Sequence, residues 1–304
     1  MQRIYNYGSF LQAYALKKMM EECGAEVEFV DYHPGECILP SKETTGMKRK
    51  IQKGLEILRM KGRLRDKIQF VKYKKNYARK NYPVLGLKET YNYAPKLDLL
   101  VIGSDEVFNC IQDNSNVGFA PELFGAGHQA NRLISYAASF GNTTLESLKK
   151  YQVADQVAQW LRAFDALSVR DENSRKIVQE LIGKDPVCHL DPVLAYDYPA
   201  KLPETKAKIP HDPYMILYGY SGRFNKEEAG EIRKYAKRKG LKILCIGGIQ
   251  RCGDKFIDCS PFEIFEYFKH AESVVTDTFH GTIFSVVTQK KVCNFCEKER
   301  VWKF

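Results

Sequence analysis

The feature that most constrains this chain is the regular alternation of short apolar segments with longer segments of helical period. Short apolar runs bounded by small or polar residues are typical of buried parallel strands, and the amphipathic segments between them are typical of crossover helices. The runs expected to form strands are 97–102, 133–138, 166–169, 187–190, 214–218, 241–246 and 273–276. Strands that alternate with helices predict an α/β fold whose parallel sheets are covered by helices on both faces.

A proline-rich stretch without period, 196–213, separates two runs of this alternation and is expected to be a linker. A chain of 304 residues also exceeds the usual size of one hydrophobic core. We therefore predict two Rossmann-like parallel-sheet domains, an N-terminal one over 1–200 and a C-terminal one over 208–304, with a cleft between them.

The N-terminal residues follow the same pattern. Asn6-Tyr7-Gly8 opens a segment of helical period, and residues 26–32 alternate as a strand does. A turn, a helix and a strand are the second half of a βαβ unit, whose first strand would precede Asn6.

The net charge of +10 is concentrated in one segment. Residues 42–80 contain fifteen Lys and Arg against three acids, a balance of +12, so the rest of the chain carries −2. We expect a basic insertion of two helices broken at Gly62, with Leu64, Ile68 and Val71 lining the face of the second helix. Basic amphipathic helices often meet an anionic membrane surface, and we expect this one to serve an acceptor there. A nucleic acid is the less favoured partner, although aromatic residues are interleaved with the basic ones.

Composition predicts a cytoplasmic protein, with peripheral contact at the inner face of the membrane as a further expectation. No run of about 18 apolar residues occurs, and the first residues lack the pattern of a signal peptide. Nine scattered cysteines favour reduced thiols over a disulfide framework. Cys293 and Cys296 have the spacing of a metal site, but buried, unligated cysteines are the preferred interpretation, and no metal is expected.

Polar or small residues follow four of the predicted strands, where ligands bind in open parallel sheets. The densest group follows 273–276, where Thr278, His280 and Gly281 begin a helix whose amide groups and dipole favour an anion. We expect His280 to be exposed there and to move a proton or bind the anion. The candidates at the other strand ends are Ser104, Asp105, Ser139 and Arg170.

Each candidate also has a structural interpretation. Thr278 fits a simple helix cap, and His280 fits a histidine whose hydrogen bonds are satisfied within the fold. Arg170 fits an ion pair with a neighbouring acid, and Asp105 fits a turn residue that binds its own backbone.

Taken together, the segments resemble the polysaccharide pyruvyl transferase family. The matching stretches run in the family's order from Asn6 to Ser285. They are Asn6-Tyr7-Gly8 with 11–16, 98–105, 135–141, 169–172 with Ser174, 190–193, and 275–282 with Phe284-Ser285. Family members usually begin with a further strand and continue beyond the histidine-bearing helix, and this chain is expected to lack both.

The resemblance implies a two-domain fold similar to GT-B glycosyltransferases, with phosphoenolpyruvate as donor substrate, no cofactor, and a pyruvate ketal on a cell-surface glycan sugar as product. It implies His280 and Asp105 as catalytic residues. Donor binding would fall to Arg170, Ser104, Ser139, Thr278 and Gly281. A glycan or a lipid-linked oligosaccharide would be the acceptor.

Two other functions remain open on the sequence. A nucleotide-sugar glycosyltransferase of the GT-B type would share the architecture and would bind a different donor. An inactive, truncated relative that acts as a partner subunit would share the fold and perform no reaction.

Overall fold

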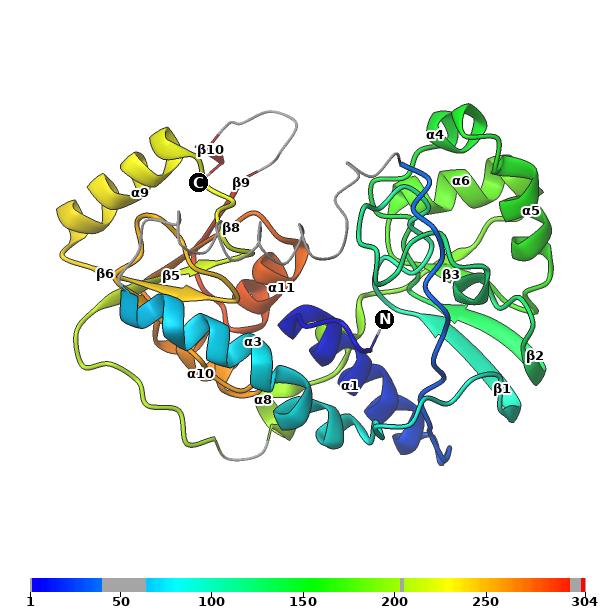
Figure 1. The fold of residues 1–304 in the computed structure, drawn as a ribbon, viewed down its shortest axis with the longest axis horizontal. Coiled ribbons are helices and arrows are strands. Elements are labelled where there is room, and N and C mark those ends of the chain that lie inside the picture. The colour runs from blue at the N-terminus through cyan, green and yellow to red at the C-terminus, as the bar shows by residue number, and fades with distance from the viewer. Residues whose placement is uncertain (1, 40–63, 203–204, 296–301, 304) are drawn as a thin grey trace. The chain divides into compact units, whose positions relative to one another are not determined.

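The computed structural model describes residues 2–39, 64–202, 205–295 and 302–303. The chain forms two compact units. The first unit comprises Met1–Ile4, Gln12–Glu43 and Pro83–Tyr196, and the second comprises Tyr5–Leu11, Thr44–Tyr82 and Asp197–Phe304. Each unit contains parallel strands and helices, which confirms the predicted α/β class (Figure 1).

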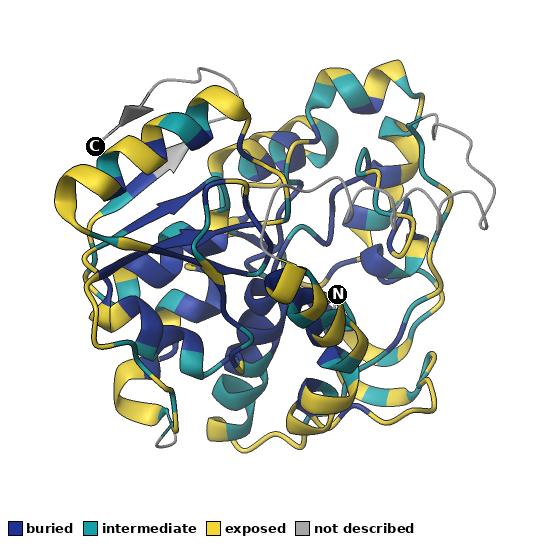
Figure 2. Cartoon of the chain, turned by 60° about the vertical axis from the view of Figure 1, so that its left-hand side comes forward, coloured by how far each residue is buried: buried dark blue, intermediate teal, exposed yellow. Residues whose placement is uncertain are grey.

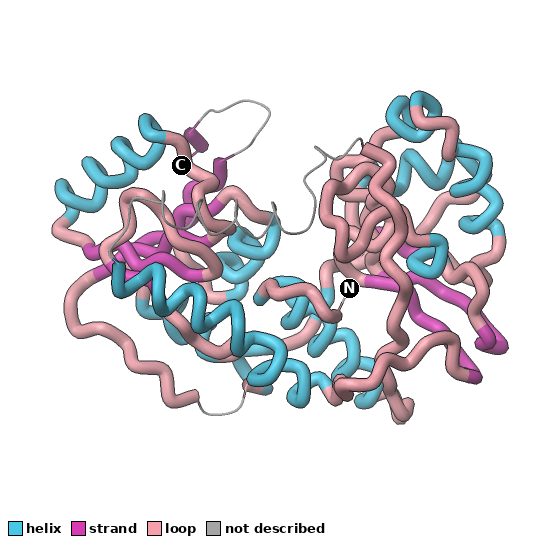
Figure 3. The backbone as a smooth tube through the Cα atoms, viewed as in Figure 1, coloured by secondary structure: helices cyan, strands magenta, loops and turns pink. Residues whose placement is uncertain are grey.

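The first unit is built on short parallel strands. β1 (Lys96–Gly103) pairs in parallel with β2 (Gln129–Tyr136) along its whole length. β3 (Ser168–Val169) pairs in parallel with β4 (Val187–Cys188). Isolated bridges join Ile134 of β2 to Ala166, and Ala138, just after β2, to Val169 of β3. Loops connect most of these elements, as the pink tube in Figure 3 shows.

Helices and aromatic rings form the core of the first unit. Its helices are η1 (Pro121–Phe124), α4 (Leu145–Lys150), α5 (Ala154–Arg162), α6 (Glu172–Ile182) and α7 (Pro192–Ala195). α4 and α5 are separated by 151–153, where Gln152 has a φ of +58°. The Phe108 ring stacks on that of Phe124 (4.8 Å between centroids) and lies tilted against that of Phe140 (5.3 Å), so a cluster of aromatic rings lies in a core that also contains aliphatic residues.

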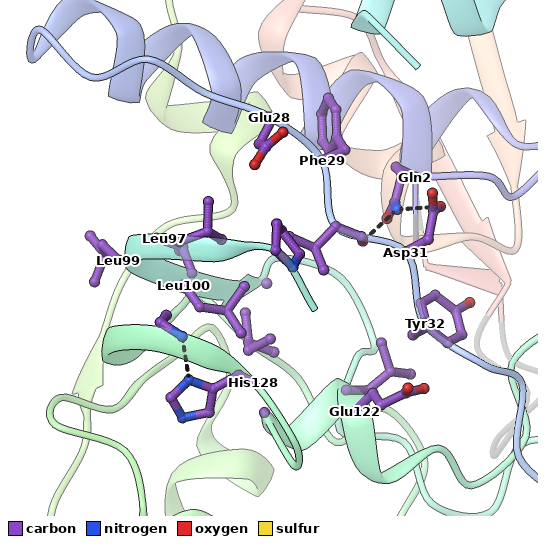
Figure 4. Close-up of a pocket in the computed structure, with 18 of the residues that line it drawn as sticks. Gln2, Glu28, Phe29, Asp31, Tyr32, Leu97, Leu99, Leu100, Glu122 and His128 are labelled. Carbon is purple, nitrogen blue, oxygen red and sulfur yellow. Dashed lines mark hydrogen bonds between the residues drawn. The ribbon is translucent and has the colours of Figure 1, made fainter. Parts of the chain in front are cut away.

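Residues 26–32 form a loop and not the strand that we predicted. Their only regular pairing within the described residues is one bridge from Asp31 to Tyr93. A cavity of about 220 Å³ lies along the segment and is lined by 26–32, by residues of β1 and by apolar side chains such as Leu16 and Met20 (Figure 4). The prediction was wrong because alternation describes the faces of a strand, whereas a strand also needs a neighbour that accepts its hydrogen bonds.

The second unit contains a sheet in the order β10-β9-β8-β5-β6-β7. Its strands are β5 (Tyr214–Tyr218), β6 (Lys242–Ile246), β7 (Lys255–Phe256), β8 (Ser273–Thr276), β9 (Val292–Phe295) and β10 (Trp302–Lys303). All neighbours are parallel except β9 and β10. The chain runs from β5 outward to β6 and β7 and then returns to β8 on the other side of β5. Every residue of β5 is buried, in keeping with the dark blue strands in Figure 2.

Helices α8 (Tyr198–Lys201), α9 (Lys226–Lys239), α10 (Glu263–His270) and α11 (Phe279–Val287) complete the second unit. Local sequence explains the limits of α9. Asn225 caps its start through a capping box with Glu228, and Gly240 ends it in the left-handed conformation.

Helix α3 (Leu64–Leu85) comes from the basic segment; residues 40–63, which include the first expected helix and Gly62, lie outside the described residues. Its buried face carries Phe70, Tyr73 and Tyr77. The predicted face was wrong, because Leu64, Ile68 and Val71 are exposed. The rings of Phe70 and Tyr73 pack on Phe256 of the second unit, so larger aromatic side chains outcompete the aliphatic ones for burial.

The unit boundaries differ from the expected limits at 200 and 208, because Tyr5–Leu11 and Thr44–Tyr82 group with the second unit. Helix α1 (Tyr7–Glu22) begins in the second unit and continues in the first. No helix among the described residues has the length and apolar character needed to cross a membrane.

Candidate functional site

In the second unit, a sharp turn lies at the point where the strand order reverses. β5 and β8 are parallel neighbours, and the chain continues from β5 to β6 on the opposite side. Ligands in open parallel sheets bind at the carboxyl ends of such strands. The segment that follows β8, 277–281, carries the densest group of candidate residues and includes the start of α11.

Thr278 and Gly281 build this turn. The Thr278 hydroxyl accepts a hydrogen bond from the Gly281 amide (3.0 Å), and the Thr278 amide donates to the Thr276 hydroxyl (3.1 Å). Thr278 is therefore a helix cap, as its structural interpretation proposed. A Cβ at position 281 would lie 2.2 Å from the Thr276 hydroxyl and 2.7 Å from the Tyr218 ring, so only glycine fits. The tight turn therefore places the start of α11 against the end of β8.

His280 lies in the first turn of α11 and meets the opening motif of the chain. A Cβ at Gly8 would lie 2.3 Å from the imidazole Cγ, so the absence of a side chain at Gly8 makes room for the ring. Asn6 fixes this approach, since its side-chain oxygen accepts from the Gly8 amide (2.7 Å). Two of the matching stretches, from the two ends of the chain, thus converge on one imidazole.

The environment of His280 corrects one expectation. We expected an exposed side chain, but only 8% of His280 is accessible. Its ring lies 6.0 Å from that of Phe284 and is covered by Gly8 on another side. Because the start of α1 packs over it, the imidazole contributes to packing as well as to the polar turn.

Residues that follow β5 and β6 lie at the same carboxyl edge of the sheet as the turn before α11. Arg223 Nε pairs with a carboxylate oxygen of Asp277, and the side chain of Asn6 donates to the Tyr220 hydroxyl. The side-chain amide of Gln250, from the loop after β6, donates to the Tyr220 carbonyl oxygen (2.6 Å). A Cβ at Gly248 would lie 2.3 Å from the Ser221 amide, so the two loops are in close contact.

Burial keeps the neighbouring phenols protonated. It raises the pKa of Tyr218 well above its usual value, and nearby Tyr220 and Tyr77 add to the shift. It raises the pKa of Tyr7 in the same way, with Cys259 as the next cause. The Tyr7 hydroxyl donates to the Cys259 carbonyl oxygen (2.8 Å), which anchors the start of α1 to the second unit. At neutral pH, Tyr7 and Tyr218 are therefore uncharged hydrogen-bond donors that pack beside the turn.

In the first unit, Ser104, Asp105 and Arg170 form a second, buried polar group together with Asp191. Arg170 Nη1 lies 2.7 Å from Asp191 Oδ2, and Arg170 Nη2 lies 3.6 Å from Asp105 Oδ1. Ser104 Oγ donates to the Ala137 carbonyl oxygen (2.9 Å) and lies 3.4 Å from Asp191 Oδ2. Two carboxylates thus surround one guanidinium, which fits the ion-pair interpretation of Arg170.

Asp105 and Ser139 also have local structural roles. Asp105 adopts a φ of +71°, a left-handed conformation that aspartate tolerates, and its carboxylate accepts from the Glu106 amide (3.0 Å). Ser139 Oγ donates to Asp171 (2.6 Å), and Asp171 caps α6 through the Ser174 amide (2.8 Å). The structure therefore brings Asp105 next to Arg170 and ties Ser139 to the start of α6.

Glu106 is a titratable residue of this edge that sequence reasoning missed. Burial raises the pKa of its carboxyl group, and the adjacent Asp105 carboxylate raises it further. Glu106 Oε2 accepts from the Asn109 side chain (2.9 Å), and a Cβ at Gly141 would lie 2.6 Å from it. A partly buried carboxyl group with a raised pKa is a candidate proton donor.

Sequence reasoning missed other residues for an identifiable reason. Tyr220 and Arg223 follow β5, and Gln250 follows β6, but the ends of these two strands were not included among the candidate edges. The rule that ligands bind at strand carboxyl ends would have found them. Gln12, whose side chain accepts from the Ser104 amide (3.1 Å), had no signal beyond its place in a matching stretch.

The described residues contain no group of three or more His, Cys, Asp or Glu side chains that could hold a metal ion. Cys293 is buried on β9, and Cys296 lies outside the described residues. Burial raises the pKa of Cys245 to about 12, of Cys252 to about 11 and of Cys259 to about 12, so these thiols are protonated.

Solved structures with distant similarity to this chain include an epimerase and a glycosyltransferase. A proposed UDP-N-acetylglucosamine 2-epimerase from Listeria monocytogenes is 12% identical with a TM-score of 0.41, covering 67% of this chain and 58% of that one. The iron-containing dodecameric glycosyltransferase TibC from enterotoxigenic Escherichia coli H10407 is 13% identical with a TM-score of 0.28, covering 66% and 58%. The chain thus spans less than two thirds of the length of either.

A search of curated proteins finds no match to this chain. The model of the family described as polysaccharide pyruvyl transferase matches residues 6–295. This range contains both polar groups and every candidate residue. The chain therefore belongs to the polysaccharide pyruvyl transferase family.

Proposed function

We propose that the protein is a transferase that moves a pyruvyl group from phosphoenolpyruvate to hydroxyl groups of a glycan sugar. The observation that carries this proposal is the convergence of Asn6, Gly8 and His280 at the start of α11, next to the point where the strand order reverses. Family membership supplies the reaction class, and the site supplies an imidazole at a helix N-terminus.

The proposed donor suits this turn. Phosphoenolpyruvate carries a phosphate and a carboxylate, and the first amide groups of a helix bind such anions. Thr278 and Gly281 shape the turn that presents these amides, and His280 adds an imidazole within the same helical turn. No metal or cofactor enters the proposed reaction.

The proposed reaction balances in protons. The methylene carbon of phosphoenolpyruvate takes up one proton, two sugar hydroxyls lose one each as they bond to the central carbon, and phosphate leaves with the other. His280 supplies or accepts a proton or stabilises the leaving phosphate, and Asp105 is the second proposed catalytic group. Donor binding by Arg170, Ser104 and Ser139 rests on the resemblance, since all three make bonds within the first unit.

Phosphate release from phosphoenolpyruvate, measured across a panel of sugar acceptors, tests the proposal. His280→Gln should reduce turnover by about 10²–10⁴-fold, the usual loss for a positioned proton-transfer group. Glutamine retains much of the volume that packs against Gly8. His270→Gln, at the exposed end of α10, is the matched control and should leave turnover unchanged. Normal turnover in His280→Gln would exclude a catalytic imidazole.

A nucleotide-sugar glycosyltransferase is the second candidate. The loops after β5 and β6 contain Gly219, Gly222, Gly247 and Gly248, and their close contact beside the start of α11 also suits a diphosphate. Release of a nucleoside diphosphate from a nucleotide sugar, without phosphate release from phosphoenolpyruvate, would favour this function.

A further inference from the structure

Helix α3 has two faces of different character, and its inner face is fixed. The Phe70 ring packs edge-on against Phe256 (5.4 Å between centroids), and the Tyr73 ring lies 5.8 Å from that of Tyr7. The Tyr77 hydroxyl donates to the Asn6 carbonyl oxygen (2.8 Å). These contacts hold the inner face against the second unit, so the opposite face points away from the core of that unit (Figure 1).

That opposite face carries aliphatic side chains in contact with water. Leu64, Ile68 and Val71 are spaced at i, i+4 and i+7 and are therefore neighbours along one side of the helix. Their accessible fractions are 69%, 62% and 48%. Three adjacent aliphatic side chains at such exposure are unfavourable in water and indicate an interaction surface.

Positive charge surrounds these aliphatic residues. Exposed basic residues lie beside them and along the next turns of the same side: Arg65, Lys72, Lys75 and Arg79. The only acidic residue of the helix, Asp66, is buried on the inner face. The outward face of α3, meaning these seven residues, therefore combines apolar contact area with positive charge.

We propose that the outward face of α3 binds the surface of an anionic phospholipid bilayer. An interfacial helix inserts its aliphatic side chains at the boundary between headgroups and acyl chains, while its basic residues meet the anionic headgroups. A nucleic acid fits this surface less well, because the aromatic side chains that would stack on bases are buried in the inner face. The binding does not depend on the proposed transferase activity.

Cosedimentation of the full chain with phosphatidylcholine vesicles, with and without phosphatidylglycerol, tests the proposal. We expect binding to the anionic vesicles alone. Replacing Lys72, Lys75 and Arg79 with Gln should weaken it by about a hundredfold, or about fivefold for each charge removed. Ile68→Gln with Val71→Gln should weaken it by about tenfold without any change in charge.

Helix α9 offers a control of equal charge. Lys237, Arg238 and Lys239 are exposed at its end, with no exposed large apolar side chain in that helix. Their replacement with Gln should leave vesicle binding unchanged. Equal losses of vesicle binding in the two triple variants would overturn the proposal and indicate nonspecific attraction by charge. Unchanged vesicle binding in the α3 variants would also overturn it. Binding of single-stranded or duplex oligonucleotides through these residues, without vesicle binding, would also overturn it. Circular dichroism and thermal unfolding should show that every variant is folded.

Discussion

At the scale of single residues, we expect the same substitution to change stability in opposite directions at two glycines that both lie in helices. Gly8 and Gly230 both lie within helices. A Cβ at Gly8 would meet the His280 ring at 2.3 Å, whereas a Cβ at Gly230 would meet nothing within 4 Å. Gly8 belongs to a matching stretch of the sequence, but only the fold shows that it lies against His280, which is far along the chain.

Gly8→Ala should lower turnover in the phosphate-release assay and destabilise the protein by about 1–3 kcal/mol, because the imidazole or α1 must shift. Gly230→Ala should stabilise it by about 1 kcal/mol through helix propensity, with unchanged turnover. Chemical denaturation and the assay measure the two effects. Equal behaviour of the two variants would show that Gly8 does not position His280.

Two arginines provide a second matched pair at this scale. Arg170 lies between Asp191 and Asp105 with only 5% of its side chain accessible, while Arg175 pairs with Asp185 on the surface with 38% accessible. Removing one partner of a buried ion pair leaves an unpaired buried charge, whereas exposed pairs contribute little.

Arg170→Ala should therefore reduce the free energy of unfolding by about 3–5 kcal/mol, and Arg175→Ala by no more than about 1 kcal/mol. Urea denaturation measures both. The ion pairs give Arg170 a structural role beside the donor-binding role that the resemblance implies. A stable Arg170→Ala protein with weakened donor binding would leave only the donor-binding role.

At the scale of elements, the sequence predicted the type of most helices and strands but not the buried face of α3. Two sets of apolar residues compete for burial on that helix, the aliphatic set that begins at Leu64 and the aromatic set that begins at Phe70. Periodicity alone fits both sets. The choice depends on Tyr7 and Phe256, which are distant in sequence and provide aromatic partners. The strand expected over 26–32 failed for a related reason, since its pairing partner is not a local property.

Substitutions along α3 separate the two faces. Phe70→Ala should destabilise the protein by about 3–5 kcal/mol, because it leaves a cavity against Phe256. Ile68→Ala, two residues away on the outward face, should change stability by no more than about 0.5 kcal/mol. Thermal or urea unfolding measures both. A reversal of these effects would mean that the aliphatic face is the buried one.

At the scale of the whole molecule, the alternation of apolar and amphipathic segments predicted the α/β class correctly. Parallel strands are buried on both faces and so are apolar throughout, whereas the helices that cover them are amphipathic. The division of the chain was harder to predict. Short N-terminal segments join the second unit through packing of Tyr7 and Phe70, which a linear search for linkers does not detect. The same long-range packing brings Gly8 to His280, so the grouping of segments and the candidate site have a common origin.

Because α1 has residues in both units, we expect the two units to unfold together in one calorimetric transition. A donor that binds only the folded protein should raise the temperature of that transition. Phosphoenolpyruvate at 100 times its dissociation constant should add about 2.7 kcal/mol. His280→Gln should reduce this gain, while His270→Gln should retain it. A shift produced by nucleotide sugars alone would assign the turn before α11 to a different donor. Two separate transitions would show instead that α1 does not couple the units. In that case, phosphoenolpyruvate should raise the temperature of only one transition, the one that His280→Gln also affects.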